Sequence, residues 1–205
     1  MAGINKAGDW VRPVSSGSHG LFLAQCGVDG HWPAVLDVVE FGYLRPLDDP
    51  AQPENFLIDG SPWRLSKQLP REEAYGLLRR FLAEGPLLLG NRGNAVPEEE
   101  AAENGEGSLA LIEPTTVVSL LMRPPEEERQ KLRPRLVFDF GGRRYDLPLT
   151  DVPIEKAVKE AGVGEYAPED LGFDASGRVL VTVSLGEAFN GWHHKLAAAV
   201  LFLPG

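Results

Sequence analysis

The sequence has a single cysteine and no long hydrophobic run. Cys26 has no partner for an internal disulfide among the 205 residues, so the cysteine content does not indicate an oxidising compartment. No apolar stretch approaches the roughly 20 residues that a membrane-spanning helix needs. The first residues also lack the basic region followed by an apolar block that is typical of a secretion signal. We therefore expect a cytoplasmic protein that does not insert into a membrane.

Positive charge is scarce as well. The chain has 20 Lys and Arg against 30 Asp and Glu, a formal net charge of -10. This disfavours a protein that coats nucleic acid through an overall positive field. The charge is unevenly spread, because residues 123–144 carry seven basic and four acidic side chains. A local basic ridge on an acidic protein is compatible with this pattern.

Motifs for catalysis or metal binding are missing. The sequence contains no glycine-rich phosphate loop, nucleophile elbow or paired-histidine metal helix. His19, Cys26 and His31 have no fourth ligand nearby at a standard zinc spacing. We therefore expect no cofactor and no metal, and a non-catalytic protein is favoured over an enzyme.

Glycine and proline are plentiful, which favours turns and short strands over a helical bundle. The clearest pattern is 136–149, where two alternating apolar runs flank Gly141-Gly142 and predict a β-hairpin. Further strands are predicted at 34–44, 108–114, 115–122, 177–189 and 192–203. The strand at 34–44 is predicted to be largely buried on both faces.

Two short helices are predicted. One covers 71–85, after Pro70, and the other follows Asp151, which is placed to cap it, and ends at Gly162. Residues 90–107 have almost no bulky apolar side chain and predict an acidic flexible linker or loop. The fold expected is mostly β with short helices, as two tandem OB-like small barrels. The first spans 1–89 with a helical insertion near 71–85, and the second spans 108–205.

The stretch "GDWVRPVS" (8–15) holds the first candidate binding residues. Trp10 and Arg12 are two apart, so they share one face of an extended strand. On an open barrel face, the indole can stack on a base and the guanidinium can pair with a phosphate. Alternatively, Trp10 belongs to the core and Arg12 forms a salt bridge with an acid such as Asp37 or Glu40.

The stretch "GGRRYD" (141–146) holds the second set. Arg143 and Arg144 follow the predicted hairpin turn, and Arg133 and Arg135 lie on the pairing segment. Four guanidinium groups on one hairpin can form a phosphate-binding ridge. Alternatively, they form a solvated charged edge that discourages strand-to-strand aggregation.

The stretch "FNGWHHKLAA" (189–198) holds the third set. His193 and Lys195 share one face of the last predicted strand, and Trp192 and His194 share the other. Histidine can stack on a base or donate to a phosphate, so this cluster is the richest candidate in the second half of the chain. Alternatively, the tryptophan packs in the core and the histidines are exposed.

Seven phrases, in order over nearly the whole chain, resemble the dual OB-containing domain family of prokaryotes. They are "DWVRPVS" (9–15), "LDVVEF" (36–41), "QPENFLID" (52–59), "SLALIEP" (108–114), "YDLPLTD" (145–151), "VTVSLGEAF" (181–189) and "HHKLAAAVL" (193–201). The resemblance implies two OB-type barrels in tandem and a nucleic-acid-binding or nucleotide-binding role. The positions that match the family are Trp10, Arg12, Glu54, Asn55, Thr150, Asp151, Ser184, Glu187 and Lys195.

One feature departs from the family. Its members begin with an extra strand before the "WVRPVS" element, whereas about nine residues precede Trp10 in this sequence. Either the start lies upstream or the first barrel lacks one edge. An open edge would favour a protein partner or a dimer.

The leading hypothesis is an accessory protein that binds single-stranded nucleic acid or a nucleotide without catalysis. Its predicted contacts are Trp10, Arg12, Arg143, Arg144, His193 and Lys195, with Asn55, Asp151 and Glu187 as further polar candidates. The alternative is a protein-interaction module that engages a partner enzyme through an open barrel edge. A third reading is a catalytic site at the junction of the two halves, where Asp151, Glu187 and Lys195 would converge.

Overall fold

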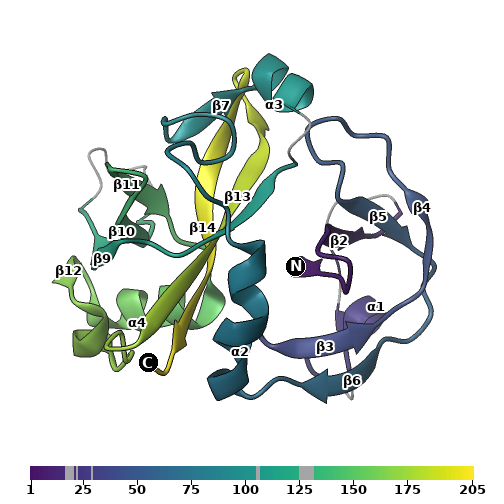
Figure 1. Cartoon of the computed structure of the whole chain (residues 1–205), viewed down its shortest axis with the longest axis horizontal. Helices are drawn as coiled ribbons and strands as arrows, with labels where there is room; N and C mark the ends of the chain where they lie inside the picture. The colour runs from purple at the N-terminus through teal and green to yellow at the C-terminus, as the bar shows by residue number, and fades with distance from the viewer. Residues whose placement is uncertain (17–20, 22, 29, 105–106, 125–131) are drawn as a thin grey trace.

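The computed structural model describes residues 1–16, 21, 23–28, 30–104, 107–124 and 132–205. Two lobes lie on either side of helix α2 (Arg71–Leu78), which continues into the short 3-10 helix η1 (Arg79–Phe81) (Figure 1). We call the part with strands β1 to β6 the N-terminal lobe and the part with strands β7 to β14 the C-terminal lobe. As predicted, the fold is mostly β with short helices.

The strands of the N-terminal lobe are short: β1 (Gly3–Ile4), β2 (Trp10–Val14), β3 (Asp37–Glu40), β4 (Tyr43–Pro46), β5 (Asn55–Ile58) and β6 (Arg64–Gln68), with helix α1 (Leu23–Cys26) between β2 and β3. One sheet has the order β1-β2-β5-β4, and β3 pairs with β6 in a separate ribbon. The predicted strand at 34–44 is divided at Gly42, where a Cβ would clash with the Asp59 carboxylate. Contrary to the prediction, every residue of β4 is exposed.

The N-terminal lobe has a small core of its own. Among the described residues, its hydrophobic cluster contains only Cys26, Ile58 and Trp63 as buried members, with Trp63 stacked on Phe41 at a centroid distance of 4.6 Å. The main cluster of the C-terminal lobe contains eighteen buried residues. The N-terminal lobe must therefore gain much of its stability from contacts with the rest of the molecule.

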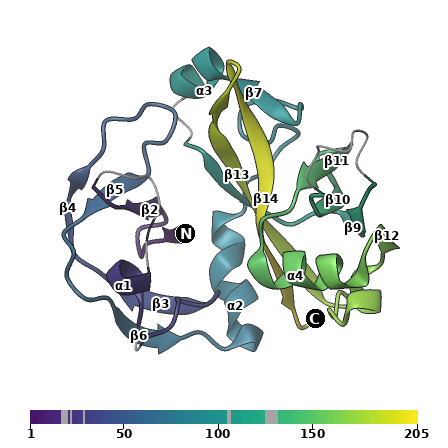
Figure 2. The ribbon, with the colours of Figure 1, turned by 180° about the vertical axis from the view of Figure 1, so that it is seen from behind.

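The C-terminal lobe contains β7 (Ala95–Pro97), α3 (Glu98–Asn104), β8 (Leu109–Ile112), β9 (Thr116–Met122), β10 (Arg135–Phe140), β11 (Arg143–Pro148), α4 (Val152–Ala161), β12 (Gly164–Tyr166), η2 (Pro168–Leu171), β13 (Arg178–Phe189) and β14 (Trp192–Leu203). Strand β9 pairs with β10 and β10 with β11, while β8 pairs with β13 and β13 with β14. A parallel bridge from Leu149 to Ala197 joins the end of β11 to β14. Strand β8 leads directly into β9, so the two together form the first strand of a barrel of the OB type. The other strands of this barrel are β10, β11, β13 and β14, and helix α4 lies between β11 and β13 in the chain (Figure 2).

The hairpin predicted at 136–149 is confirmed in register. Gly141 and Gly142 form its turn with φ angles of 58° and 73°, and Phe140 pairs with Arg143. The predicted cap is also present, because the Asp151 carboxylate accepts a hydrogen bond from Ile154 N at the start of α4. In the part of the chain that the structure describes, no helix has the length and apolar character needed to cross a bilayer.

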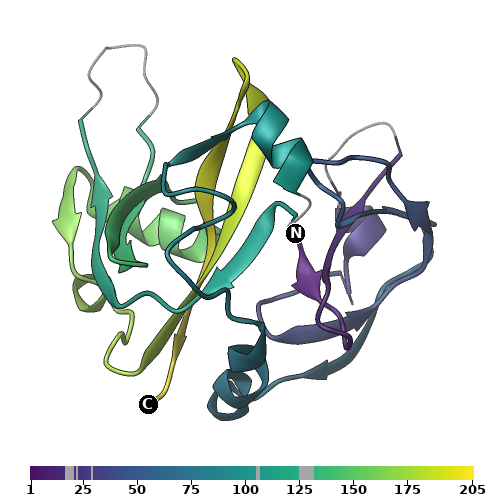
Figure 3. The same ribbon diagram turned by 45° about the horizontal axis from the view of Figure 1, so that its top comes forward.

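Segment 90–107 differs from the predicted acidic loop, because it contains strand β7 and helix α3. Strand β7 pairs with residues 192–194 of β14, and α3 lies against the β13–β14 hairpin (Figure 3). Two small side chains are sufficient to anchor the segment: Val96 and Ala101 are buried against Leu185. Backbone pairing with β14, which the composition of the segment does not reveal, compensates for the scarcity of bulky apolar residues.

A hydrophobic cluster joins the two lobes around α2. Its buried members are Ala74 of α2 and Leu111, Leu180, Leu201 and Leu203 of the C-terminal lobe. The N-terminal lobe contributes Ile4, Trp10 and Leu36, which pack partly buried against it. Trp10 therefore packs partly buried between the lobes, which agrees with the alternative that it belongs to a hydrophobic core. Stacking of its indole on a base is not supported.

A buried polar cluster lies beside this hydrophobic contact. Arg12 Nη2 donates to Ser108 Oγ at 2.8 Å and to Ser184 Oγ at 3.2 Å, and it lies 3.1 Å from Glu54 Oε1. Ser108 in turn donates to the Glu54 carboxylate through both its Oγ and its backbone N. We call these four residues the inter-lobe lock. Arg12 thus forms a salt bridge, as the sequence alternative stated, but with Glu54 rather than with Asp37 or Glu40.

We predict strong energetic coupling between Arg12 and Glu54. Because Glu54 and Ser108 are buried, removing one charge leaves the other uncompensated at a cost of about 3–5 kcal/mol. A double-mutant cycle of Arg12→Ala and Glu54→Ala, followed by urea unfolding, is expected to give a coupling energy of about 1–3 kcal/mol. The exposed pair Arg64–Glu40 is the control, with an expected coupling below about 1 kcal/mol. Equal coupling in the two pairs would contradict the structural role of the lock.

Candidate functional site

Lys195 is fully buried and cannot contact a ligand at the surface. Its ammonium donates to Asn91 O, Asn91 Oδ1 and Gly93 O at 2.8–2.9 Å, which occupies all three of its N–H groups. Burial, with a smaller effect of Arg143, lowers the pKa of Lys195 to about 8. The prediction of Lys195 as a nucleic-acid contact is therefore corrected: the residue fastens the loop before β7 to β14.

His193 and Asn55 are also buried. His193 Nδ1 lies 2.8 Å from Gly186 O, and Asn55 Nδ2 donates to Gln52 Oε1 at 3.0 Å. The remaining polar atoms, His193 Nε2 and Asn55 Oδ1, have no hydrogen-bond partner among the described residues. His193 thus contacts the backbone of Gly186 and Asn55 the side chain of Gln52, and neither side chain is available at a surface site.

The predicted arginine ridge is divided between two faces of the hairpin. Arg144 lies on the outer face of the barrel, where its Nε donates to Asp139 Oδ1 at 3.0 Å. Arg135 pairs with Asp146 on the same face, and Arg123 approaches Asp146 Oδ2 at 2.7 Å. Each of these guanidinium groups therefore has a carboxylate partner, which reduces the positive potential available to a phosphate.

Arg143 differs from Arg144 because it has no carboxylate partner among the described residues. It is exposed, and its guanidinium lies 5.7 Å from the centre of the Tyr145 ring. Burial raises the pKa of Tyr145, and the positive charges of Arg143 and Arg92 partly oppose this shift. No ion pair joins Arg92 or Arg143 to an acid in the ranges that the structure describes. Arg143 is therefore an exposed cation whose charge is not neutralised by a described carboxylate.

An open groove of about 420 Å³ runs over the outer face of the barrel. Its lining includes the aliphatic residues Val118, Leu121, Val137 and Val163, with charged groups such as Arg144 around them. In OB folds the outer face of the second and third strands commonly binds oligonucleotides or oligosaccharides. No aromatic ring lines this groove among the described residues, so stacking on bases is not supported.

The structure does not support the predicted catalytic site of Asp151, Glu187 and Lys195. The Asp151 carboxylate binds the backbone N of Ile154 and of Val200, whereas Glu187 is exposed on the β13–β14 hairpin. No hydrogen bond or ion pair between described atoms connects either residue to Lys195. Within the same ranges, no group of three or more His, Cys, Asp or Glu side chains has the arrangement of a metal site, and His19 lies outside them.

The turn between β13 and β14 carries an exposed aromatic pair. Phe189 and Trp192 are paired across the hairpin, and their exposed fractions are 66% and 46%. Asn190 and Gly191 form the turn with φ angles of 51° and 78°. We call residues 187–194, with the adjoining helix α3, the hairpin tip. The Asn-Gly turn signal was present in the sequence, but the exposure of Phe189 was not predicted.

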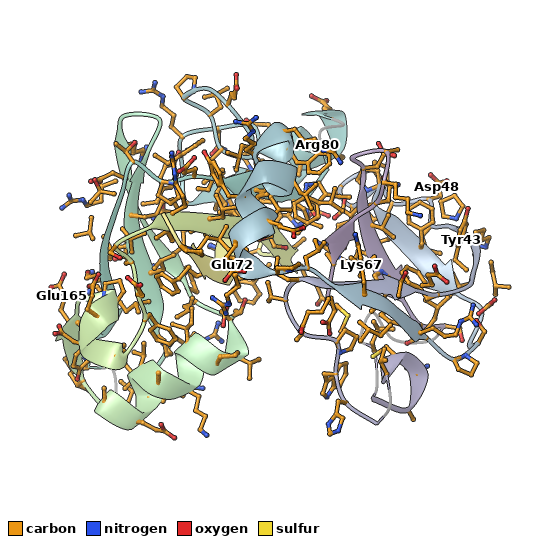
Figure 4. All side chains as sticks on the ribbon, turned by 60° about the horizontal axis from the view of Figure 1, so that its bottom comes forward. Tyr43, Asp48, Lys67, Glu72, Arg80 and Glu165 are labelled. Atoms are coloured by element: carbon orange, nitrogen blue, oxygen red, sulfur yellow. The ribbon has the colours of Figure 1, made fainter. Side chains whose placement is uncertain are left out.

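The N-terminal lobe has an open sheet edge. Its four-stranded sheet ends at β1 on one side and at β4 on the other, and no strand of the described residues pairs with the outer side of either. On β4, Tyr43 is 57% exposed and Leu44 is 66% exposed. Tyr43 lies at the far end of the molecule from Glu165 of β12, which lines the groove on the other barrel (Figure 4). A single channel crossing both lobes is therefore not supported.

We predict that Lys195 makes stability rise with pH above about 8. Below pH 8 the Lys195 amine is charged in both the folded and the unfolded state. Between 8 and its unfolded value of 10.5 the unfolded chain binds one more proton, so the free energy of unfolding increases, by up to about 3 kcal/mol. Urea unfolding of the wild type and Lys195→Met across this range should show the increase in the wild type only. Parallel curves would contradict the prediction.

Comparison with known proteins agrees with the barrel topology. The family model of the dual OB-containing domain matches residues 1–200. No curated protein and no solved structure matches the chain. Since the match covers almost the whole sequence, the chain belongs to the dual OB-containing domain family.

Proposed function

We propose that the protein is a protein-interaction module whose N-terminal lobe binds a partner through the open edge formed by β4. The observation that carries this proposal is the exposure of the whole edge strand, including the large apolar side chains of Tyr43 and Leu44. An edge strand presents unpaired backbone groups that a strand from another chain can complete. The added strand would extend the sheet β1-β2-β5-β4 beyond β4.

The balance between core and surface in the N-terminal lobe supports this function. Among the described residues its cluster has three buried members, whereas six of its large hydrophobic side chains are exposed: Met1, Trp32, Val35, Tyr43, Leu44 and Leu65. Exposed apolar surface that a small core cannot accommodate is typical of a binding site for another protein. A partner strand at β4 would cover part of this surface.

The use of the basic residues disfavours the nucleic-acid hypothesis. Of the six predicted contacts, Arg12, His193 and Lys195 are held by contacts inside the protein, and Arg144 pairs with Asp139. The formal net charge of -10 adds an unfavourable field for phosphates. An edge that binds peptide backbone does not depend on positive charge.

Binding of single-stranded nucleic acid or a nucleotide remains a second candidate because Arg143, one of the predicted contacts, is exposed and has no acidic partner in the described structure. Fluorescence anisotropy with a labelled single-stranded oligonucleotide at low salt tests it. Binding that Arg143→Glu weakens would support this candidate over the protein-interaction module.

We predict that Leu44→Lys weakens partner binding at least tenfold, because a lysine on an edge strand opposes strand addition. The partner that co-purifies from the native host is titrated against each variant, and hydrogen exchange is measured on the complex. Slower exchange of the β4 amides in the complex is expected. Val152→Lys, at an equally exposed apolar position of the C-terminal lobe, is the control and should bind as the wild type does. Unprotected β4 amides with full binding by Leu44→Lys would refute the proposal.

A further inference from the structure

We propose that the hairpin tip of the C-terminal lobe is a second interaction surface, which binds a lysine-rich or arginine-rich segment of a protein. The surface combines two exposed aromatic rings with a one-sided surplus of carboxylates. It lies on a different lobe from the open edge at β4, so the proposal does not depend on the function assigned to that edge.

The aromatic pair is held on a fixed backbone. Phe189 and Trp192 face each other across a two-residue turn, and directly paired residues of antiparallel strands point to the same face of the sheet. His194 is two residues further along β14 and is also exposed, so it continues the same face. The rings therefore present a ready surface for a ligand.

Strand β7 and helix α3 support the tip from the side. Trp192 pairs with Pro97, and His194 pairs with Ala95. The backbone N of Glu98 donates to Gly191 O at 3.0 Å, which ties the start of α3 to the turn. The contact between His193 Nδ1 and Gly186 O fixes the opposite face of the hairpin. The tip is thus braced by its neighbours rather than free to fold away.

The two segments that form the tip, 95–104 and 186–194, carry charge of one sign. Helix α3 carries the exposed residues Glu98, Glu99, Glu100 and Glu103, and the hairpin adds Glu187. Neither 95–104 nor 186–194 contains a lysine or an arginine. None of the five carboxylates belongs to an ion pair in the described ranges, so their charge is available to a ligand.

This combination selects a cationic ligand. Lysine and arginine side chains stack on tryptophan and phenylalanine faces and pair with carboxylates, so one basic segment can use both kinds of group. The glutamates would repel phosphates. A purely apolar ligand would form no ion pairs with their carboxylates. Tryptophan at the centre of a surface with a polar surround is also typical of protein interface hot spots.

The test uses a fluorescein-labelled peptide with three repeats of Gly-Lys-Gly-Arg and a twin with glutamate in place of every lysine and arginine. Fluorescence anisotropy at low salt is expected to show binding of the basic peptide, weakened by added salt, and no binding of the acidic twin. Trp192→Ala and Phe189→Ala should each weaken binding at least tenfold. Circular dichroism and thermal unfolding check that these exposed substitutions leave the fold intact.

Matched controls separate the tip from the overall acidity of the protein. The double variant Glu98→Lys/Glu99→Lys should weaken binding at least tenfold. The double variant Glu72→Lys/Glu73→Lys, with the same change of charge on α2, should not, and neither should Trp32→Ala, at an exposed tryptophan of the N-terminal lobe. No binding of the basic peptide, equal losses in both double variants, or Trp192-dependent binding of single-stranded DNA would each overturn the proposal. None of these results bears on Leu44→Lys or on the β4 edge.

Discussion

The salt bridge between Arg12 and Glu54 is the interaction on which the arrangement of the molecule depends. It lies where β2 and the segment before β5 meet β8 and β13, and Ser108 and Ser184 complete its hydrogen bonds. Removing a charged pair from water is costly unless hydrogen bonds compensate for the lost hydration, and the two serine hydroxyls supply such bonds. Through these serines, and with the hydrophobic contact around Trp10, the pair connects a lobe with a small core to a lobe with a large one.

In other parts of the protein, too, basic side chains are used for contacts within the fold. Several basic side chains serve internal contacts: Arg12 in the lock, Lys195 under the loop before β7, and Arg144 on its aspartate. The acidic side chains of α3 have no such partners among the described residues and remain at the surface. Most of the side chains predicted to bind a phosphate therefore form contacts within the protein instead. What the surface offers instead is apolar, aromatic and acidic, which is why we favour proteins over nucleic acids as partners.

The two proposed surfaces differ in chemistry as well as position. The β4 edge would bind through backbone groups and apolar side chains, and the hairpin tip through aromatic rings and carboxylates. The lobes are joined by the lock and by α2, and Ala51 of the N-terminal lobe also packs against the cluster beneath α3. The two proposed surfaces therefore lie on lobes that are in direct contact with each other.

Patterns that are local in the chain were predicted correctly, because the physical cause lies within a few residues. Alternation around Gly141-Gly142 specified the β10–β11 hairpin, and Asp151 specified the start of α4. Segment 90–107 was misjudged because its order comes from pairing with β14, about 100 residues away. The sequence by itself thus determined the β-rich class, the family and the main strands of the C-terminal barrel, whereas most of the short strands of the N-terminal lobe were not predicted. Only the tertiary structure decided that Arg12 meets Glu54, that Lys195 is enclosed and that Phe189 and Trp192 are exposed, because burial and partners depend on which distant segments the fold brings together.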